Sequence, residues 1–133
     1  MVSFVAAMAM KRPENVIVKK TEEFADRILK MYKYLLARHS SDKDMLRQVY
    51  RSGTSIGANT AESQYAQSRA DFLTKLTIAL KEANETKFWI GRLYSNGSLT
   101  EQEFSSINSD AEEIIKLLTS ITGTVKKSLQ KES

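Results

Sequence analysis

Apolar or small residues return in alternating steps of four and three over two long stretches of this chain. In the first stretch the repeat consists of Phe72, Leu76, Ala79, Ala83, Thr86, Ile90 and Leu93. In the second it consists of Phe104, Ile107, Ala111, Ile114, Leu118, Ile121 and Val125. These steps keep every member on one side of an α-helix, and that side must be buried against other elements. The spacing predicts helices over residues 69–94 and 101–129.

Residues that cap helices stand in front of both stretches. Ser68 with Asp71, and Thr100 with Glu103, have the spacing of a capping box, in which side chains satisfy free N–H groups at a helix start. Gly97 lies between the two stretches and can adopt the left-handed conformation that often ends a helix. We therefore expect a short turn between two antiparallel neighbours.

Two further helices are predicted in the first half of the chain, over residues 18–38 and 43–67. The first presents two adjacent apolar rows, Phe24, Ile28, Met31, Leu35 and Ala25, Leu29, Tyr32, Leu36. A turn at residues 39–42 follows, in which Ser41 or Asp42 can act as the next cap. The second helix contains the row Leu46, Val49, Gly53, Ile56 and Thr60.

Glycine occupies two interior positions of this second helix, and each glycine costs about 1 kcal/mol relative to alanine. Gly53, Gly57 and Ala61 lie four residues apart and therefore share one face. We expect this face to form a groove of small residues on which another backbone packs closely.

Four amphipathic helices joined by short turns predict one all-α domain, an antiparallel up-down four-helix bundle over residues 18–129. Residues 1–17 are predicted to be an irregular lead-in and residues 130–133 a tail, with Met1, Met8 or Met10 as the natural start. The chain has 133 residues and no cysteine, a composition that fits one core in a reducing cytoplasm. No apolar run reaches the ~18 residues of a membrane-spanning helix.

We find no residue pattern typical of a catalytic or metal centre. The only histidine, His39, is not preceded by glutamate at the spacing that a di-iron bundle requires. No serine is paired with a general base. We therefore expect no enzyme and no cofactor, and an enzyme that uses Glu62, Glu82 and Glu85 is the most remote alternative.

A second stripe flanks the predicted core on the second and third helices. It contains the only tryptophan, next to arginine and glutamate, a composition typical of interfaces. We predict a homo-oligomer interface formed by Ser52, Gly53, Ser55, Gly57, Asn59, Glu62, Glu82, Glu85, Trp89 and Arg92. The alternative is that the stripe is an ordinary solvent-exposed face.

The net charge of +4 results from 20 basic and 16 acidic residues, which makes the surface mildly basic. Such a surface allows weak attraction to RNA or DNA. Arg47 and Arg51, which lie on one outer face, are the first candidates for nucleic-acid contacts, and Lys43, Lys75 and Lys81 are weaker candidates.

The run at residues 51–63, RSGTSIGANTAES, resembles the signature of a bacterial four-helix bundle family known from intervening sequences in large-subunit ribosomal RNA genes. Residues 71–73 (DFL), residues 81–86 (KEANET) and Trp89 fit the same family, and the resemblance extends over residues 15–122. It implies a four-helix protomer that assembles into a ring-like homopentamer. A distantly related branch serves diversity-generating retroelements, where it binds a reverse transcriptase and nucleic acid through a surface more basic than this one.

The sequence thus predicts a non-enzymatic, homo-oligomeric binding or adapter protein of the cytoplasm. Structured RNA or a ribonucleoprotein is the expected partner. The alternative is a structural module that binds only proteins.

Overall fold

A computed structural model describes residues 13–38 and 40–132, and these residues contain helices and no strands. Helix α2 spans Pro13–Arg38 and is followed by a short 3-10 helix, η1, at Ser40–Asp42. Helices α3 (Lys43–Ser63), α4 (Arg69–Ser95) and α5 (Glu101–Glu132) complete the chain.

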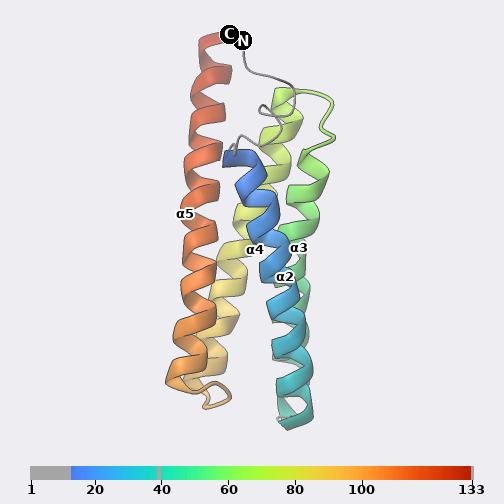
Figure 1. The fold of residues 1–133 in the computed structure, drawn as a ribbon, viewed down its shortest axis with the longest axis vertical. Helices are drawn as coiled ribbons and strands as arrows, with labels where there is room; N and C mark the ends of the chain where they lie inside the picture. Colours follow the sequence, from blue (N-terminus) through green and yellow to red (C-terminus); the bar gives the residue numbers. More distant parts are fainter. Residues whose placement is uncertain (1–12, 39, 133) are drawn as a thin grey trace, which may run out of the picture.

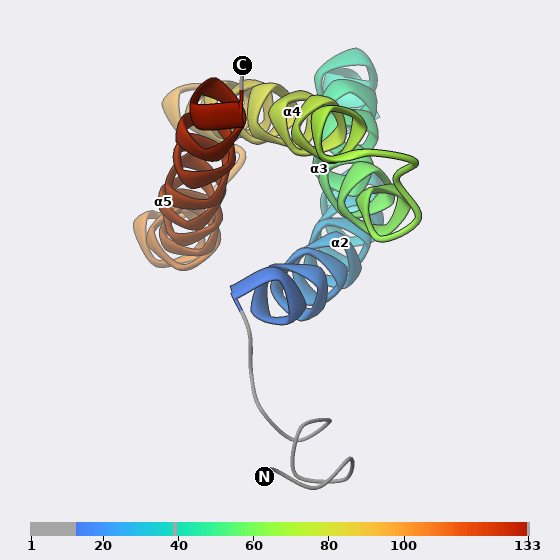
Figure 2. The same ribbon diagram turned by 90° about the horizontal axis from the view of Figure 1, so that it is seen from above.

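Successive helices run in opposite directions along the long axis of the molecule (Figure 1). Viewed from one end, α2, α3, α4 and α5 follow one another around the core in chain order (Figure 2). Helix α3 contacts α2 and α4 extensively, whereas α2 and α5 contact each other much less. The predicted up-down order is therefore present, and the bundle is most open between its first and last helices.

The core consists of the apolar rows that the sequence spacing singled out. Four side chains of α4 are at most 1% exposed: Leu76, Ala79, Ala83 and Ile90. On α2, Ile28 and Leu35 are buried to the same extent. On α5 the buried face comprises Ile107, Ala111, Ile114, Leu118, Ile121 and Val125. Burying a side chain of this size contributes about 1.5–3 kcal/mol, which explains why the spacing of these rows predicts the helices.

Three helix boundaries differ from the prediction by three residues or more. Residues 13–17, expected in an irregular lead-in, belong to α2, because proline suits the first turn of a helix and Ile17 is fully buried. Helix α3 ends at Ser63 rather than residue 67. Tyr65, within the predicted last turn, is 88% exposed and would give a longer helix no buried face. Helix α5 continues to Glu132, beyond the predicted end at residue 129. The candidate start residues Met1, Met8 and Met10 lie outside the described residues.

The predicted caps of α4 and α5 are confirmed. The Ser68 hydroxyl accepts the Asp71 N–H at 3.0 Å, while the Asp71 carboxylate accepts the Gln67 N–H at 3.2 Å in place of the Ser68 N–H of a full capping box. Thr100 and Glu103 exchange two bonds, since the Thr100 N–H donates to the Glu103 carboxylate at 2.9 Å and the Glu103 N–H to the Thr100 hydroxyl at 3.1 Å. Gly97 has the expected left-handed conformation, with φ of 87°.

Asp42 precedes α3, but its side chain does not cap that helix. Its carboxylate instead accepts the Ser98 hydroxyl at 2.6 Å. The prediction of a side-chain cap by Asp42 was therefore wrong, because the α4–α5 turn lies at the same end of the bundle and offers a competing donor.

No helix among the described residues is both long enough and apolar enough to cross a membrane.

Candidate assembly surface and nucleic-acid interface

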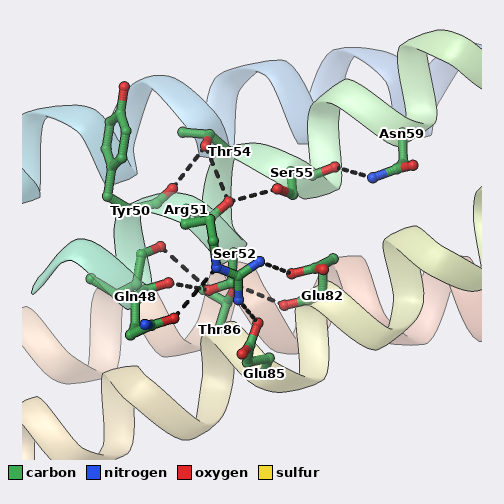
Figure 3. Close-up of polar contacts among 11 residues, drawn as sticks. Gln48, Tyr50, Arg51, Ser52, Thr54, Ser55, Asn59, Glu82, Glu85 and Thr86 are labelled. Carbon is green, nitrogen blue, oxygen red and sulfur yellow. Dashed lines mark hydrogen bonds and ion pairs between the residues drawn. The ribbon is translucent and has the colours of Figure 1, made fainter. Parts of the chain in front are cut away.

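The two helices that carry the predicted stripe, α3 and α4, meet within one protomer, where stripe residues contact neighbours outside the predicted set. Arg51 on α3 contacts two carboxylates of α4, Glu82 at 3.3 Å and Glu85 at closer range (Figure 3). We call this contact and the neighbouring Ser52–Thr86 pair the α3–α4 seam. It joins two helices of the same chain through charged and hydroxyl groups at the edge of the core.

Ser52 lies deepest in the seam and is fully buried. The Thr86 hydroxyl, also buried, donates to the Ser52 hydroxyl at 2.9 Å, while Ser52 donates to the Gln48 carbonyl of its own helix at 2.9 Å. Both hydroxyls are therefore satisfied, as buried polar groups must be. The prediction that Ser52 lies between subunits is corrected, because its side chain is 0% exposed within one protomer and leaves no surface for a second copy to contact.

Gly53 and Gly57 form the close contact that their spacing predicted, but with α2 of the same protomer. A Cβ atom on Gly57 would lie 3.1 Å from the backbone oxygen of Thr21, and one on Gly53 would lie 2.8 Å from Cγ1 of Ile28. These glycines are thus buried inside the bundle and not at a subunit interface. Ala61, the third member of the predicted groove, is exposed.

The remaining α3 members of the stripe lie nearer the surface. Ser55 and Asn59 are half-buried and donate to carbonyls of their own helix, those of Arg51 at 2.7 Å and Ser55 at 2.9 Å. Glu62 is exposed and forms an ion pair with Lys75 of α4 at 3.3 Å. Beside them the outward side of α3 carries small uncharged residues, Thr54, Ala58 and Ala61.

Trp89 is half-buried against the core, and its indole Nε1–H has no hydrogen-bond partner among the described residues. The neighbouring Phe88 is 56% exposed, with the Arg92 guanidinium 5.7 Å from its ring centroid. Ile78 is 37% exposed on the same helix. We call Ile78, Phe88 and Arg92 the α4 outer face. An exposed aromatic ring covered by arginine is typical of the residues that anchor protein interfaces.

The candidates for nucleic-acid contacts are not equally free. Arg51 is held between two carboxylates, Lys75 pairs with Glu62, and Arg47 lies 3.8 Å from Asp44. Lys43 and Lys81 are exposed and form no ion pair with any described carboxylate. The local charge around Arg51 is negative, so the expectation that Arg51 contacts phosphate does not fit this arrangement.

Burial raises the pKa of the Glu82 carboxyl above its usual value, and this effect outweighs the opposing attraction of Arg51. Glu85 adds to the rise through a hydrogen bond and its own charge. The two carboxylates share one guanidinium, so their negative charge is only partly neutralised. Glu82 therefore takes up a proton more readily than an exposed glutamate.

The spacing of apolar residues in the sequence does not indicate the groove that lies between α2 and α5. It has a volume of about 630 Å³ and is lined by Arg27, Lys30, Met31, Tyr34, Leu99, Gln102, Glu103, Ser106 and Ile107. The signal that could have found it is a charge run, because residues 27–41 contain four lysines or arginines and no acidic residue.

Among residues 13–38 and 40–132, no three acidic or histidine side chains converge in a way that could hold a metal ion. His39, the only histidine in the sequence, lies outside the described residues.

Four antiparallel helices with a glycine-bearing second helix define this chain as a small all-α bundle protein. It belongs to the 23S rRNA-intervening sequence protein family, whose sequence model matches residues 13–120. The predicted resemblance is thereby confirmed. The chain is also similar to a crystal structure of a protein of unknown function from the S23 ribosomal protein family of Bacteroides thetaiotaomicron. The two are 49% identical with a TM-score of 0.81, over 84% of this chain and 99% of that one. None of the curated proteins matches this chain.

Proposed function

We propose that this chain is a non-enzymatic binding protein of the cytoplasm that assembles with copies of itself and associates with structured RNA or a ribonucleoprotein. Its family is described by reference to 23S rRNA, which makes an RNA partner the first hypothesis. The chemistry of its own surface supports the same partner.

The observation that carries the proposal is an excess of free cations. Several side chains form no ion pair with a described carboxylate: Lys30, Lys33, Arg38, Lys43, Lys81, Arg92, Lys116, Lys126, Lys127 and Lys131. They outnumber the described carboxylates that lack a cation. Free cations attract the phosphate backbone and release its condensed counterions, which is the main source of sequence-independent affinity for nucleic acid.

Self-assembly is supported by the outward surfaces of α3 and α4. The α4 outer face exposes Phe88 and Ile78, and the adjacent side of α3 carries small uncharged residues that a second copy can approach closely. The family resemblance implies a ring of five protomers. Such a ring would repeat the net charge of +4 on every copy and so increase the attraction to RNA.

The test is a fluorescence anisotropy titration of the assembled protein with fragments of large-subunit rRNA, an unrelated hairpin and an unrelated single strand. We expect binding to all three RNAs at low salt, because phosphate contacts carry no sequence information. We also expect the affinity to fall steeply as salt is added, because these contacts release condensed counterions. Failure to bind any of these RNAs at tens of micromolar would contradict the RNA function.

The alternative function is a structural module that binds only proteins. The exposed Phe88 ring on α4 is the observation in its favour, because arginine-covered aromatic residues anchor protein partners as well as second copies. Recovery of one protein partner in stoichiometric amount from ribonuclease-treated native extract, together with the failure of the RNA titration, would favour this alternative.

A further inference from the structure

Helix α2 is divided by charge. Its second half, from Arg27 to Arg38, contains four basic residues and no acidic one, whereas residues 13–26 contain more acids than bases. Lys30 and Lys33 are exposed and form no ion pair in the part of the chain that the structure describes. Arg38 donates to the Tyr34 hydroxyl, and its guanidinium carbon lies 4.9 Å from the Tyr34 ring centroid.

Of these cations, Lys30 lines the groove between α2 and α5, whereas Lys33 and Arg38 lie on the same half of α2 outside its lining. Its floor is apolar and includes Leu99 and Ile107, which are 4% and 3% exposed. On the α2 side, Tyr34 is 46% exposed and Lys30 lines the wall. Arg27 closes one end of the groove, where it contacts Asp110 and donates to the Ser106 hydroxyl at 2.9 Å.

The two walls of the groove differ in chemistry. The α5 wall offers the neutral side chains of Gln102 and Ser106, which can form hydrogen bonds with the edge of a base. It also carries Glu103, one of whose carboxylate oxygens accepts the Thr100 N–H at 2.9 Å. A phosphate group is therefore favoured on the α2 side and disfavoured on the α5 side.

We propose that the α2–α5 groove, with Lys30 and Tyr34 in its wall and the exposed Lys33 next to Tyr34 on α2, binds an unpaired segment of nucleic acid. One base stacks on the Tyr34 ring and enters the groove, and the flanking phosphates contact Lys30 and Lys33. This inference rests on the proposed association with RNA and locates it on α2, away from the candidates Arg47 and Arg51.

The occupant is single-stranded because only an unpaired base can leave its stack and enter a concave site. The volume of about 630 Å³ lies within the range of ligand pockets, roughly 300–1,000 Å³. Stacking on an exposed aromatic ring next to free cations is the usual arrangement for single-strand binding. In a structured RNA, this segment would be a loop or a bulge.

The experiment compares variants in anisotropy titrations against a labelled single-stranded RNA, a DNA of the same sequence and a blunt-ended RNA duplex that contains no loop. The double change Lys30→Gln with Lys33→Gln should weaken single-strand binding more than tenfold at low salt. It should also reduce the slope of log affinity against log salt by about 1.4, since each single-strand phosphate contact contributes about 0.7.

Tyr34→Ala should weaken binding by about 5- to 150-fold without changing the salt slope, because stacking involves no counterions. Tyr34→Phe retains the ring and should restore most of the affinity. Thermal unfolding of each variant checks that the bundle is intact.

Matched controls lie at the other end of the bundle and in the α3–α4 connection. Lys19→Gln with Arg69→Gln makes the same change in net charge at two exposed cations that are already paired with Glu23 and Glu132, and Tyr65→Ala removes a ring that is 88% exposed. Both should bind within about twofold of the wild type. Tighter binding of RNA than of DNA would identify the 2′-hydroxyl as part of the recognised chemistry, and equal binding would identify a general single-strand site.

Equal losses in the control and groove variants would overturn the inference and leave the RNA function standing. Preference for the duplex over both single strands would overturn it as well. A wild-type protein that binds none of the probes would instead refute the proposed function itself.

Discussion

Gly57 shows at the scale of one residue how two local effects compete. Helix propensity favours almost any other residue at this position, by about 1 kcal/mol. The backbone oxygen of Thr21 would nevertheless lie 3.1 Å from a Cβ atom, and a neighbouring helix backbone cannot move aside as a flexible side chain can. The close approach of α2 therefore determines which residue this position accepts.

The first prediction is that Gly57→Leu lowers the free energy of unfolding by about 1–3 kcal/mol or more, because the added atoms overpack the α2–α3 contact. Urea denaturation measures the change. Gly91→Ala is the matched control, since it is also helical and a Cβ there meets nothing within 4 Å. It should stabilise the protein by about 0.5–1 kcal/mol through propensity alone. Stabilisation by Gly57→Leu would show that the contact with α2 is looser than the structure indicates.

At the scale of elements, helices α3 and α4 are joined at their edge by charges as well as by the core. Arg51 is shared by Glu82 and Glu85, and Ser52 and Thr86 bond beneath it (Figure 3). Partly buried ion pairs of this kind contribute little net stability, because desolvation offsets the attraction. We infer that the seam determines how the two helices are aligned more than how stable they are.

The second prediction concerns pH. The pKa of Glu82 is raised in the folded state, so the folded protein holds this proton more tightly than the unfolded chain. The free energy of unfolding therefore falls as pH rises from the ordinary glutamate pKa through the raised value. Glu82→Gln has no proton to lose, so it should be more stable than the wild type at neutral pH. The difference should vanish below the ordinary glutamate pKa of about 4.3.

Glu112→Gln is the counterpart with the opposite sign. A hydrogen bond from Lys87 lowers the pKa of Glu112, so its contribution is present at neutral pH and is lost as pH falls through the lowered value. This variant should be less stable than the wild type at neutral pH. The midpoints of urea denaturation at neutral pH and below the ordinary glutamate pKa measure the two effects. A Glu82→Gln protein that is less stable at neutral pH would mean that attraction to Arg51 outweighs burial.

At the scale of the whole molecule, the bundle has two unlike sides. One side, between α2 and α5, is basic and carries the groove, and the Lys20–Glu113 and Arg27–Asp110 ion pairs join the two helices there. In the order of helices around the core, α2 is the first and α5 the last (Figure 2). The other, formed by the outward surfaces of α3 and α4, carries small residues and the exposed Phe88 ring. Assembly through the second side would leave the first free for a ligand.

The third prediction is that the wild type in solution has a mass that is a multiple of the 15.0 kDa protomer, with five copies expected. Phe88→Glu should shift the mass towards the protomer, because it places a charge in the apolar contact between copies. Multi-angle light scattering at micromolar concentration measures both. Tyr34→Ala, on the groove side, is the control and should leave the assembly unchanged. A wild-type protein that is monomeric throughout would contradict self-assembly.

The sequence by itself determined the four helices and the N-terminal caps of α4 and α5. The core rows, the Ser68 cap, the Thr100–Glu103 capping box and the left-handed Gly97 depend on interactions within a few residues, or on a period that any partner would satisfy. The family could also be identified, because the run at residues 51–63 carries the resemblance.

Only the tertiary structure decided which partner each surface meets. The small size of Gly53 and Gly57 showed that a close contact exists, but the periodicity of one helix does not reveal whether α2 or a second copy makes it. From the sequence, Arg51 is expected to be an exposed cation on an outer face. In the fold it lies between the carboxylates of Glu82 and Glu85. The groove beside Tyr34 exists because α2 and α5, the elements farthest apart in the chain, close the bundle incompletely, and this packing is not encoded in local spacing.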